Sequence, residues 1–305
     1  MRRCAKLQRE VSMETIGAST GRILVTGATG LLGSAVVKAL VNRGIKVRAA
    51  TRHTTKIKWT DRVQPVVFDY EDPGLHRAAL DQMSGLFLIA PPLDFKAPAK
   101  LIPFIDKAKQ EGVKHVVFIS VLNADSNEQI PLIKIEKHLV KSGLAYTILR
   151  PNFFMENFSR EWLAPMIASG KIFLAAGDSK TSFISVADIA EVTAAVFQEK
   201  HYGAEYNLTG HEALGYGEAA KIISDVCGRA VTYFPISEKE MMQGVREYGM
   251  SESSIQYMLQ IFAMARKGML AEVTDTVRQV TGKAPISFKD IAKKNADIPG
   301  VQEAA

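Results

Sequence analysis

The sequence predicts an α/β protein: a Rossmann-type doubly wound parallel sheet with a smaller, mostly helical C-terminal part that binds the substrate. Three observations predict it. A glycine-rich turn joins the first apolar strand to the first helix. Continuous apolar strands then alternate with helical segments as far as Pro151, as in parallel sheets covered by helices on both faces. Beyond Pro151 this alternation stops, so we expect a second part there.

The first strand, turn and helix predict a dinucleotide site. Residues 23–26 form an apolar, strand-like run, and Leu32, Val36 and Leu40 mark the helix that follows. Glycines allow a sharp turn between them, and the unpaired N–H groups and positive end of the helix then face a pyrophosphate. A glycine-rich turn without a ligand is the alternative. The expected cofactor contacts are Gly27, Thr29, Gly30, Leu31, Leu32 and Gly33.

The second strand, residues 46–51, indicates which dinucleotide is bound. Enzymes that prefer NAD place an acidic residue after this strand, whereas a 2′-phosphate on the ribose requires cations. This chain has Arg52, Lys56 and further basic residues there, and no acidic residue before Asp61. Arginine binds phosphate through two parallel hydrogen bonds and lysine adds a point charge. We therefore expect NADP(H) rather than NAD, with a solvated basic loop as the alternative.

The alternation continues along the chain to Pro151. We expect strands at 63–68, 86–89, 116–119 and 145–149, and helices at 73–82, 97–110 and 129–141. Ligands of such sheets bind beyond the carboxyl ends of the strands. The predicted organisation is an extension at 1–20, an NADP-binding domain at 21–151 and a substrate-binding part at 152–305. A strand and a helix near 183–209 are expected to return to the sheet.

The C-terminal part is rich in aromatic residues and methionines. Phe153, Phe154 and Trp162 are candidate substrate-binding residues, with ordinary core as the alternative because aromatic residues dominate both. Six methionines between residues 238 and 270 fit either core packing or an adaptable wall over an apolar ligand.

Composition excludes several functional classes. The net charge of +6 is spread over many segments, with no basic-aromatic motif of the kind that reads nucleic acids. No window approaches eighteen apolar residues, so we expect no membrane span. Two cysteines give no disulfide framework, and the six histidines show no metal-ligand spacing. We expect a cytoplasmic monomer or homodimer without a metal, acting on a small molecule.

Three segments carry a resemblance to a known family. They are residues 27–33, 149–157 and 177–190, which read GATGLLG, LRPNFFMEN and GDSKTSFISVADIA. The chain resembles the NmrA-like branch of atypical short-chain dehydrogenases, including ergot-alkaloid (festuclavine and agroclavine) dehydrogenases, triphenylmethane reductases and quinone or azo reductases. The resemblance implies NADPH as hydride donor and a conjugated or cationic acceptor, such as an iminium, quinone, azo or triarylmethane group.

The same resemblance implies roles for further residues. Asp69 is expected beside the adenine, although Asp is also common in turns after strands. Ala90, Pro91 and Pro92 are expected at the ribose, and Ser120 at the nicotinamide. Pro151, Asn152 and Phe153 are expected to flank the carboxamide and the substrate.

The sequence lacks the Tyr-x-x-x-Lys pair that supplies the proton in ordinary short-chain dehydrogenases. Lys134, His138 and Ser120 are the candidates for a catalytic group, with a solvated helix face as the favoured interpretation of Lys134 and His138. An iminium or a cationic dye accepts hydride at carbon and needs no acid. The expected function is therefore reduction of such an acceptor. The alternative is a non-catalytic NADP(H)-binding redox sensor that acts through a protein partner. Asp188, in Ser185-x-x-Asp188, is expected to cap a helix.

Overall fold

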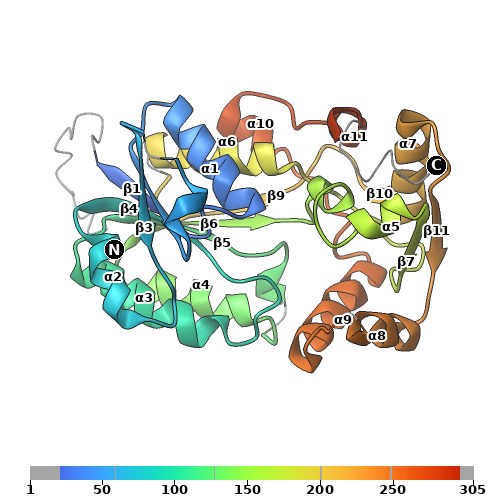
Figure 1. Ribbon diagram of the computed structural model, residues 1–305, viewed down its shortest axis with the longest axis horizontal. Coiled ribbons are helices and arrows are strands. Elements are labelled where there is room, and N and C mark those ends of the chain that lie inside the picture. Colours follow the sequence, from blue (N-terminus) through green and yellow to red (C-terminus); the bar gives the residue numbers. More distant parts are fainter. Residues whose placement is uncertain (1–20, 59, 127, 200, 248, 296–305) are drawn as a thin grey trace, which may run out of the picture.

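A seven-stranded parallel sheet forms the larger part of the molecule (Figure 1). The computed structural model describes residues 21–58, 60–126, 128–199, 201–247 and 249–295, so the predicted N-terminal extension lies outside the described residues. The strand order is β3-β2-β1-β4-β5-β6-β9, which reverses direction at β1, as in dinucleotide-binding folds. The strands are β1 (Arg22–Val25), β2 (Val47–Thr51), β3 (Val63–Val67), β4 (Met83–Ile89), β5 (His115–Ile119), β6 (Ala145–Pro151) and β9 (Ala204–Leu208).

Helices cover both faces of this sheet, which confirms the predicted fold class (Figure 1). One face carries α1 (Leu31–Asn42), α6 (Val186–Glu199) and α10 (Thr276–Thr281). The other carries α2 (Pro73–Leu80), α3 (Ala97–Gln110) and α4 (Pro131–Lys141). In the central strand β5 successive side chains are buried under opposite helical layers, Val116 and Phe118 under one and Val117 and Ile119 under the other, so this strand reads as a continuous apolar run.

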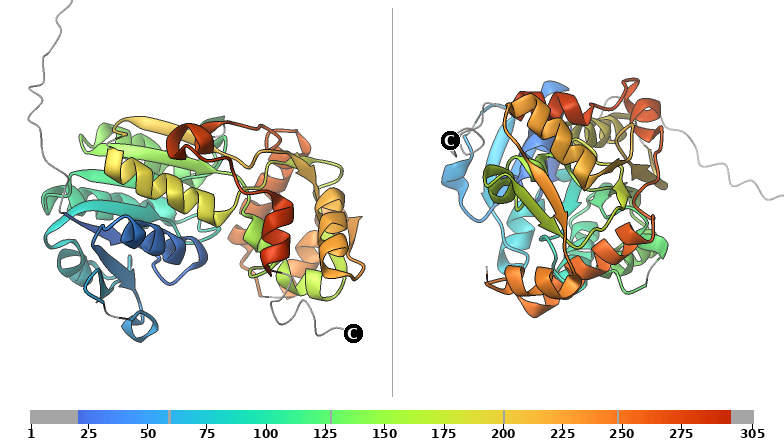
Figure 2. Two further views of the ribbon diagram at one scale, coloured as in Figure 1. Left: turned by 90° about the horizontal axis from the view of Figure 1, so that it is seen from above. Right: turned by 90° about the vertical axis from the view of Figure 1, so that its right-hand side faces the viewer.

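The C-terminal part packs around its own aromatic core at the carboxyl ends of the strands (Figure 2). Phe158, Phe183, Tyr216, Phe262 and Phe288 form this core. Its helices are α5 (Ala164–Ala168), α7 (Tyr216–Cys227), α8 (Glu238–Glu247), α9 (Glu252–Arg266) and α11 (Phe288–Asn295). Two small sheets join them: β7 (Lys171–Leu174) with β11 (Thr232–Pro235), and β8 (Lys180–Thr181) with β10 (Leu214–Gly215).

The sequence located the elements of the large sheet and missed the small sheets. β8 and β10 have two residues each, too short for a periodic pattern to show. β4 begins at Met83, three residues before the predicted start, because Ser84 and Gly85 interrupt the apolar run but remain in the strand. In the described part of the chain, no helix combines the length and apolar character needed to cross a membrane.

Candidate cofactor and substrate site

The glycine turn after β1 is shaped for close approach of an anion. Gly27 has a left-handed φ of +62°, and the N–H of Gly30 donates to the carbonyl oxygen of Gly27 at 2.9 Å. A Cβ at Gly33 would lie 2.0 Å from that same oxygen, so only glycine fits there. Helix α1 begins directly after Gly30, without a side-chain cap and without an acidic residue in its first turn. Its positive end is therefore unneutralised and can bind phosphate.

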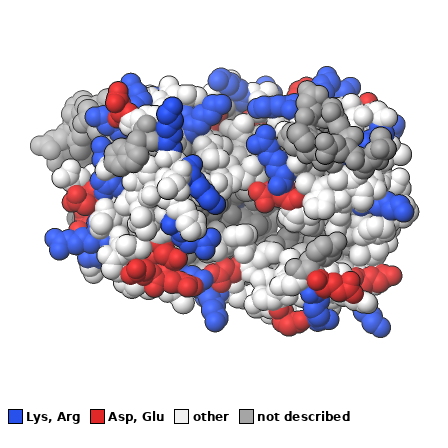
Figure 3. Space-filling view, in the orientation of Figure 1, with Lys and Arg blue, Asp and Glu red and all other residues white. Residues whose placement is uncertain are grey.

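The loop after β2 provides free cations beside this turn. Arg52, Lys56 and Lys58 are exposed, and none of their side chains has a hydrogen bond or ion pair with another described residue. The turn and the loop are joined at the sheet, because the N–H of Ala28 donates to the carbonyl oxygen of Ala50 at 3.2 Å. The space-filling view shows a hollow between the sheet part and the C-terminal part, with several Lys and Arg side chains and fewer acidic ones on its rim (Figure 3). The arrangement suits a polyanionic ligand.

Asp69 and the loop after β4 lie at the carboxyl ends of β3 and β4. One carboxylate oxygen of Asp69 accepts from the N–H of Glu71 at 3.0 Å, which is the turn interaction that the sequence also allowed. The neighbouring Tyr70 hydroxyl donates to the carbonyl oxygen of Ile89 at 2.9 Å, directly before Ala90. Ala90 and Pro91 are half-buried and Pro92 is exposed. Asp69 keeps a second carboxylate oxygen for a ligand.

Ser120 follows β5 and carries an unsatisfied hydroxyl. Its side chain is 5% exposed, and its Oγ has no hydrogen-bond partner. Its backbone N–H is already used by the carbonyl oxygen of Leu149. Buried hydroxyls without a partner are uncommon in proteins, because desolvation is then uncompensated. A ligand at the carboxyl end of β5 would supply the missing partner.

Asn152, after β6, is held within the protein. Its amide group donates to Ser182 Oγ and to the carbonyl oxygen of Leu270, both at 2.8 Å, and its Oδ1 accepts from the N–H of Phe153. The side chain thus fixes the segment after α9 to the end of β6. Pro151 is buried beside it. Of this predicted trio, Phe153 is the residue whose side chain remains partly exposed.

The candidate aromatic residues lie on two sides of the chain. The rings of Phe153 and Trp162 both pack against Phe262 of α9, at centroid distances of 6.0 and 6.3 Å. Phe154 packs instead against the cluster under α1 and α6. The structure therefore brings Phe153 and Trp162 together and separates Phe154 from them. Trp162 is 38% exposed, so it lies at the edge of this aromatic group.

Lys134 and His138 lie on the outer face of α4. The helix packs against the sheet through Ile135 and Leu139, which leaves Lys134 exposed. His138 Nε2 lies 2.7 Å from the Asp106 carboxylate of α3, so it connects two surface helices. This geometry fits a solvated face.

Comparison with known proteins agrees with this geometry. The model of the NmrA-like family matches residues 19–284. The chain belongs to the NmrA-like family. It is 34% identical over 278 residues to Prestalk A differentiation protein A of Dictyostelium discoideum, covering 89% of this chain and 91% of that one. It is 32% identical over 281 residues to the NAD(P)H azoreductase of Xenophilus azovorans, covering 90% and 98%.

A solved structure of the same family superposes over most of the chain. The crystal structure of the NADPH-dependent quinone oxidoreductase QOR2 of Escherichia coli, complexed with NADPH, matches with a TM-score of 0.78 at 27% identity. The match covers 90% of this chain and 98% of that one. The resemblance that the glycine turn and the two later motifs predict is therefore confirmed.

In this NmrA-like protein a buried ion pair, which the sequence did not predict, lies near the end of β6. Arg150 Nη2 lies 2.6 Å from a carboxylate oxygen of Glu136, which is 2% exposed on α4, and Asp125 and Glu205 also contact Arg150. Burial alone would lower the pKa of Arg150, but these carboxylates, Glu136 first, raise it. The guanidinium is saturated by protein groups and serves to fix α4 against β6.

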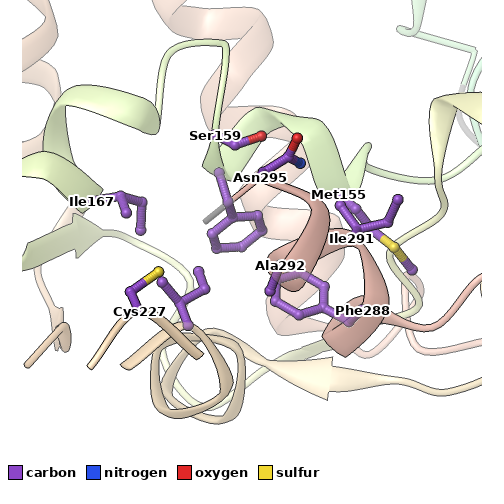
Figure 4. Close-up of a pocket in the computed structure, with 10 residues that line it drawn as sticks. Met155, Ser159, Ile167, Cys227, Phe288, Ile291, Ala292 and Asn295 are labelled. Atoms are coloured by element: carbon purple, nitrogen blue, oxygen red, sulfur yellow. The ribbon is translucent and has the colours of Figure 1, made fainter. Parts of the chain in front are cut away.

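A separate apolar pocket lies inside the C-terminal part (Figure 4). It contains none of the predicted site residues. Burial raises the pKa of the Cys227 thiol on its wall, so this cysteine is not activated. In the described part of the chain, no group of three or more potential ligands could hold a metal ion. The lining residues are Met155, Phe158, Ser159, Ile167, Ile223, Cys227, Phe288, Ile291, Ala292 and Asn295.

Proposed function

We propose that this chain is an NADPH-dependent reductase that transfers hydride to a conjugated small molecule held between the sheet part and the C-terminal part. The observation that carries the proposal is the pairing of an uncapped helix end after a glycine turn with three unpartnered cations after β2. The names of the azoreductase and quinone oxidoreductase relatives support a reductase. Bound NADPH supplies the hydride.

The chain's own residues hold the cofactor in this proposal. The backbone of residues 27–33 binds the pyrophosphate, because the glycine turn allows close approach to the uncapped N-terminal end of α1. Arg52 and Lys56 bind the 2′-phosphate. Asp69 accepts a hydrogen bond from the adenine amine, and the backbone of residues 90–92 lies beside the ribose. The unpartnered Ser120 hydroxyl meets the nicotinamide end, beside Pro151 and Phe153.

Catalysis then depends on positioning and exclusion of water. Phe153 and Trp162, which pack on the buried ring of Phe262, form an apolar wall that can hold a flat conjugated acceptor within reach of the nicotinamide. The chain lacks a Tyr-x-x-x-Lys pair, and Lys134 and His138 lie on a solvated face. A cationic or iminium carbon needs no proton, and a quinone or azo group takes its proton from water. Ketones, which need an acid most, are disfavoured.

A stopped-flow screen of NADPH oxidation tests this function. The acceptor panel contains an iminium, a quinone, an azo dye and a triarylmethane dye. We expect rapid oxidation with at least one of them and tighter binding of NADPH than of NADH. Tight NADPH binding without turnover on any panel member would overturn the reductase proposal in favour of a redox sensor that acts through a protein partner.

A further inference from the structure

Helix α9, in the C-terminal part, packs against the loops after β4 and β5 (Figure 1). The Tyr257 ring packs on Phe95 of the first loop at 5.2 Å, and the Ser254 hydroxyl donates to the carbonyl oxygen of Leu93. Ile261 packs with Leu122 of the second loop. One face of α9 is thus directed at the strand ends.

Both loops are shaped for this contact. Leu93 and Asn123 have left-handed φ values of 52° and 58°, which are uncommon for residues other than glycine. The amide of Asn123 donates to the carbonyl oxygen of Met269, directly after α9, at 2.6 Å. Such conformations cost energy and persist where the surrounding contacts determine them. The position of α9 over the strand ends is therefore specifically fixed.

Two polar side chains on this face of α9 lack partners. Residues 257 and 260 are three apart, so they are neighbours on the helix surface. Tyr257 is 5% exposed, and its hydroxyl makes no hydrogen bond with another described residue. The Oε1 of Gln260 is buried without a partner. The Oγ of Ser120, in the loop after β5, is likewise buried without a partner, and each such buried atom carries an uncompensated desolvation cost.

We propose that Tyr257 and Gln260 form the hydrogen-bonding wall of the acceptor site and select acceptors that carry a carbonyl or hydroxyl oxygen. This inference rests on the proposed reductase function and assigns its specificity to two residues of α9. The hydroxyl of Tyr257 donates to the acceptor oxygen. Gln260 Oε1 accepts from the hydroxyl that the reduced product carries.

The charges around this wall support an uncharged acceptor. Asp94, in the loop beside Phe95, is bound by Lys100 at 2.9 Å. Glu252, at the start of α9, is paired with Arg246. Among the described residues of α9 and of the loop after β4, no carboxylate is left free to balance a cationic acceptor. The wall therefore supplies hydrogen bonds and favours a quinone over a triarylmethane cation.

The proposed reaction balances with water as the only other reactant. The quinone gains a hydride, which is two electrons and a proton, from NADPH, and a second proton from solvent, and becomes a hydroquinone. Burial raises the pKa of Tyr257 to about 12, so its hydroxyl keeps its proton at neutral pH. It donates a hydrogen bond to the oxygen on which negative charge develops during the transfer.

Product binding tests the wall without turnover. Isothermal titration measures the affinity of 1,4-benzohydroquinone for the NADP⁺-loaded protein. Tyr257→Phe keeps the ring packed on Phe95, and Gln260→Leu keeps the volume. We expect each to weaken binding about 2- to 10-fold, which corresponds to one hydrogen bond. Gln256→Leu, on the exposed face of the same helix, is the matched control and should change nothing. Absence of hydroquinone binding to the wild type, or equal affinity in all variants, would refute the proposal that Tyr257 and Gln260 bind the acceptor.

Kinetics separate this inference from the proposed function. Tyr257→Phe should lower kcat/KM for 1,4-benzoquinone about 2- to 10-fold and leave that for crystal violet, a triarylmethane cation, unchanged. An equal loss of kcat/KM with both acceptors, or no loss with benzoquinone, would refute the proposed role of Tyr257. The reductase proposal itself would not be affected. If none of the acceptors supports NADPH oxidation by the wild type, the reductase proposal is refuted. The hydroquinone titration then tests the roles of Tyr257 and Gln260 in binding on its own.

Discussion

Gly33 lies against Gly27 so closely that a Cβ at position 33 would be 2.0 Å from the Gly27 carbonyl oxygen. Real Cβ atoms do not approach oxygen to this distance, so the first turn of α1 can pack on the glycine turn only without a side chain. The helix end is thereby held where its N–H groups meet the turn.

Gly33→Ala should therefore damage the cofactor site. The backbone must move to accept the methyl group, at a cost of about 1–3 kcal/mol. We expect weaker NADPH binding by fluorescence titration and a smaller rise in Tm on adding NADPH. Gly244→Ala in α8 is the control, because its Cβ would meet open space. Unchanged NADPH affinity in Gly33→Ala would place the pyrophosphate elsewhere.

Arg52→Ala tests the choice of NADPH. Arg52 is exposed and has no partner among the described residues, so removing it disturbs little in the protein itself. We expect NADPH binding to weaken by ~1.5–3 kcal/mol, the range for a hydrogen bond to a charged group, and NADH binding to change little. Lys114→Ala, an exposed cation at the amino end of β5 and so at the opposite end of the parallel strands, is the control. An equal loss for both cofactors would show that Arg52 does not contact the 2′-phosphate.

Local patterns predicted the cofactor side of the molecule because its determinants lie close together in sequence. The glycine turn and the basic residues after β2 each occupy a few consecutive positions. The doubly wound parallel sheet followed from apolar strands that alternate with helices. Lys134 and His138 lie on a solvated helix face, as their short amphipathic helix indicated.

The substrate side depends on distant contacts that no local pattern reveals. Asn152 binds Ser182 and Leu270, which are 30 and 118 residues away, so its role as an internal tie was hidden. Phe153 and Phe154 are the same residue type at adjacent positions, so both had the same expected role. Neighbouring side chains of an extended chain point to opposite sides, and the two rings therefore pack in different places. Tyr257 and Gln260 gained meaning only when α9 was placed against the loops after β4 and β5.

Asp188 links α6 to the segment before α11 and makes stability depend on pH. Its carboxylate accepts from the N–H of Ile286 at 2.9 Å, while Glu156 binds Ser185 and the N–H of Val186. The Oγ of Ser185 accepts from the N–H of Ala187 at 3.1 Å, so Ser185 caps α6 together with Glu156, whereas Asp188 makes a tertiary contact in place of the expected cap. Burial raises the pKa of Asp188 to about 6, with smaller contributions from Glu156 and Glu191.

Because the folded pKa of Asp188 exceeds its unfolded value, the folded state binds more protons between about pH 4 and 6. This group therefore lowers stability as pH rises through that window. Burial lowers the pKa of His115 to about 4, which acts in the opposite direction. Asp188→Asn keeps an acceptor for Ile286, so its stability relative to wild type should rise between pH 4 and 6.5, by on the order of 2 kcal/mol. Urea unfolding measures it, with Asp225→Asn on the surface of α7 as control. A constant difference across this range would contradict the assignment.

Lys134→Ala and His138→Ala should each lower kcat for a cationic or iminium acceptor by less than ~10-fold, whereas loss of a true general acid costs ~10²–10⁴-fold. Hydride addition to a cation needs no proton, and both side chains lie on the outer face of α4. Phe153→Ala is the contrasting variant. It removes the ring beside Phe262 and opens the wall of the site, so KM should rise and kcat should fall together, because hydride transfer requires close approach. A pH profile gives an independent measurement. An acid limb in kcat that disappears in His138→Ala, together with a collapse of the rate, would identify His138 as the proton donor after all.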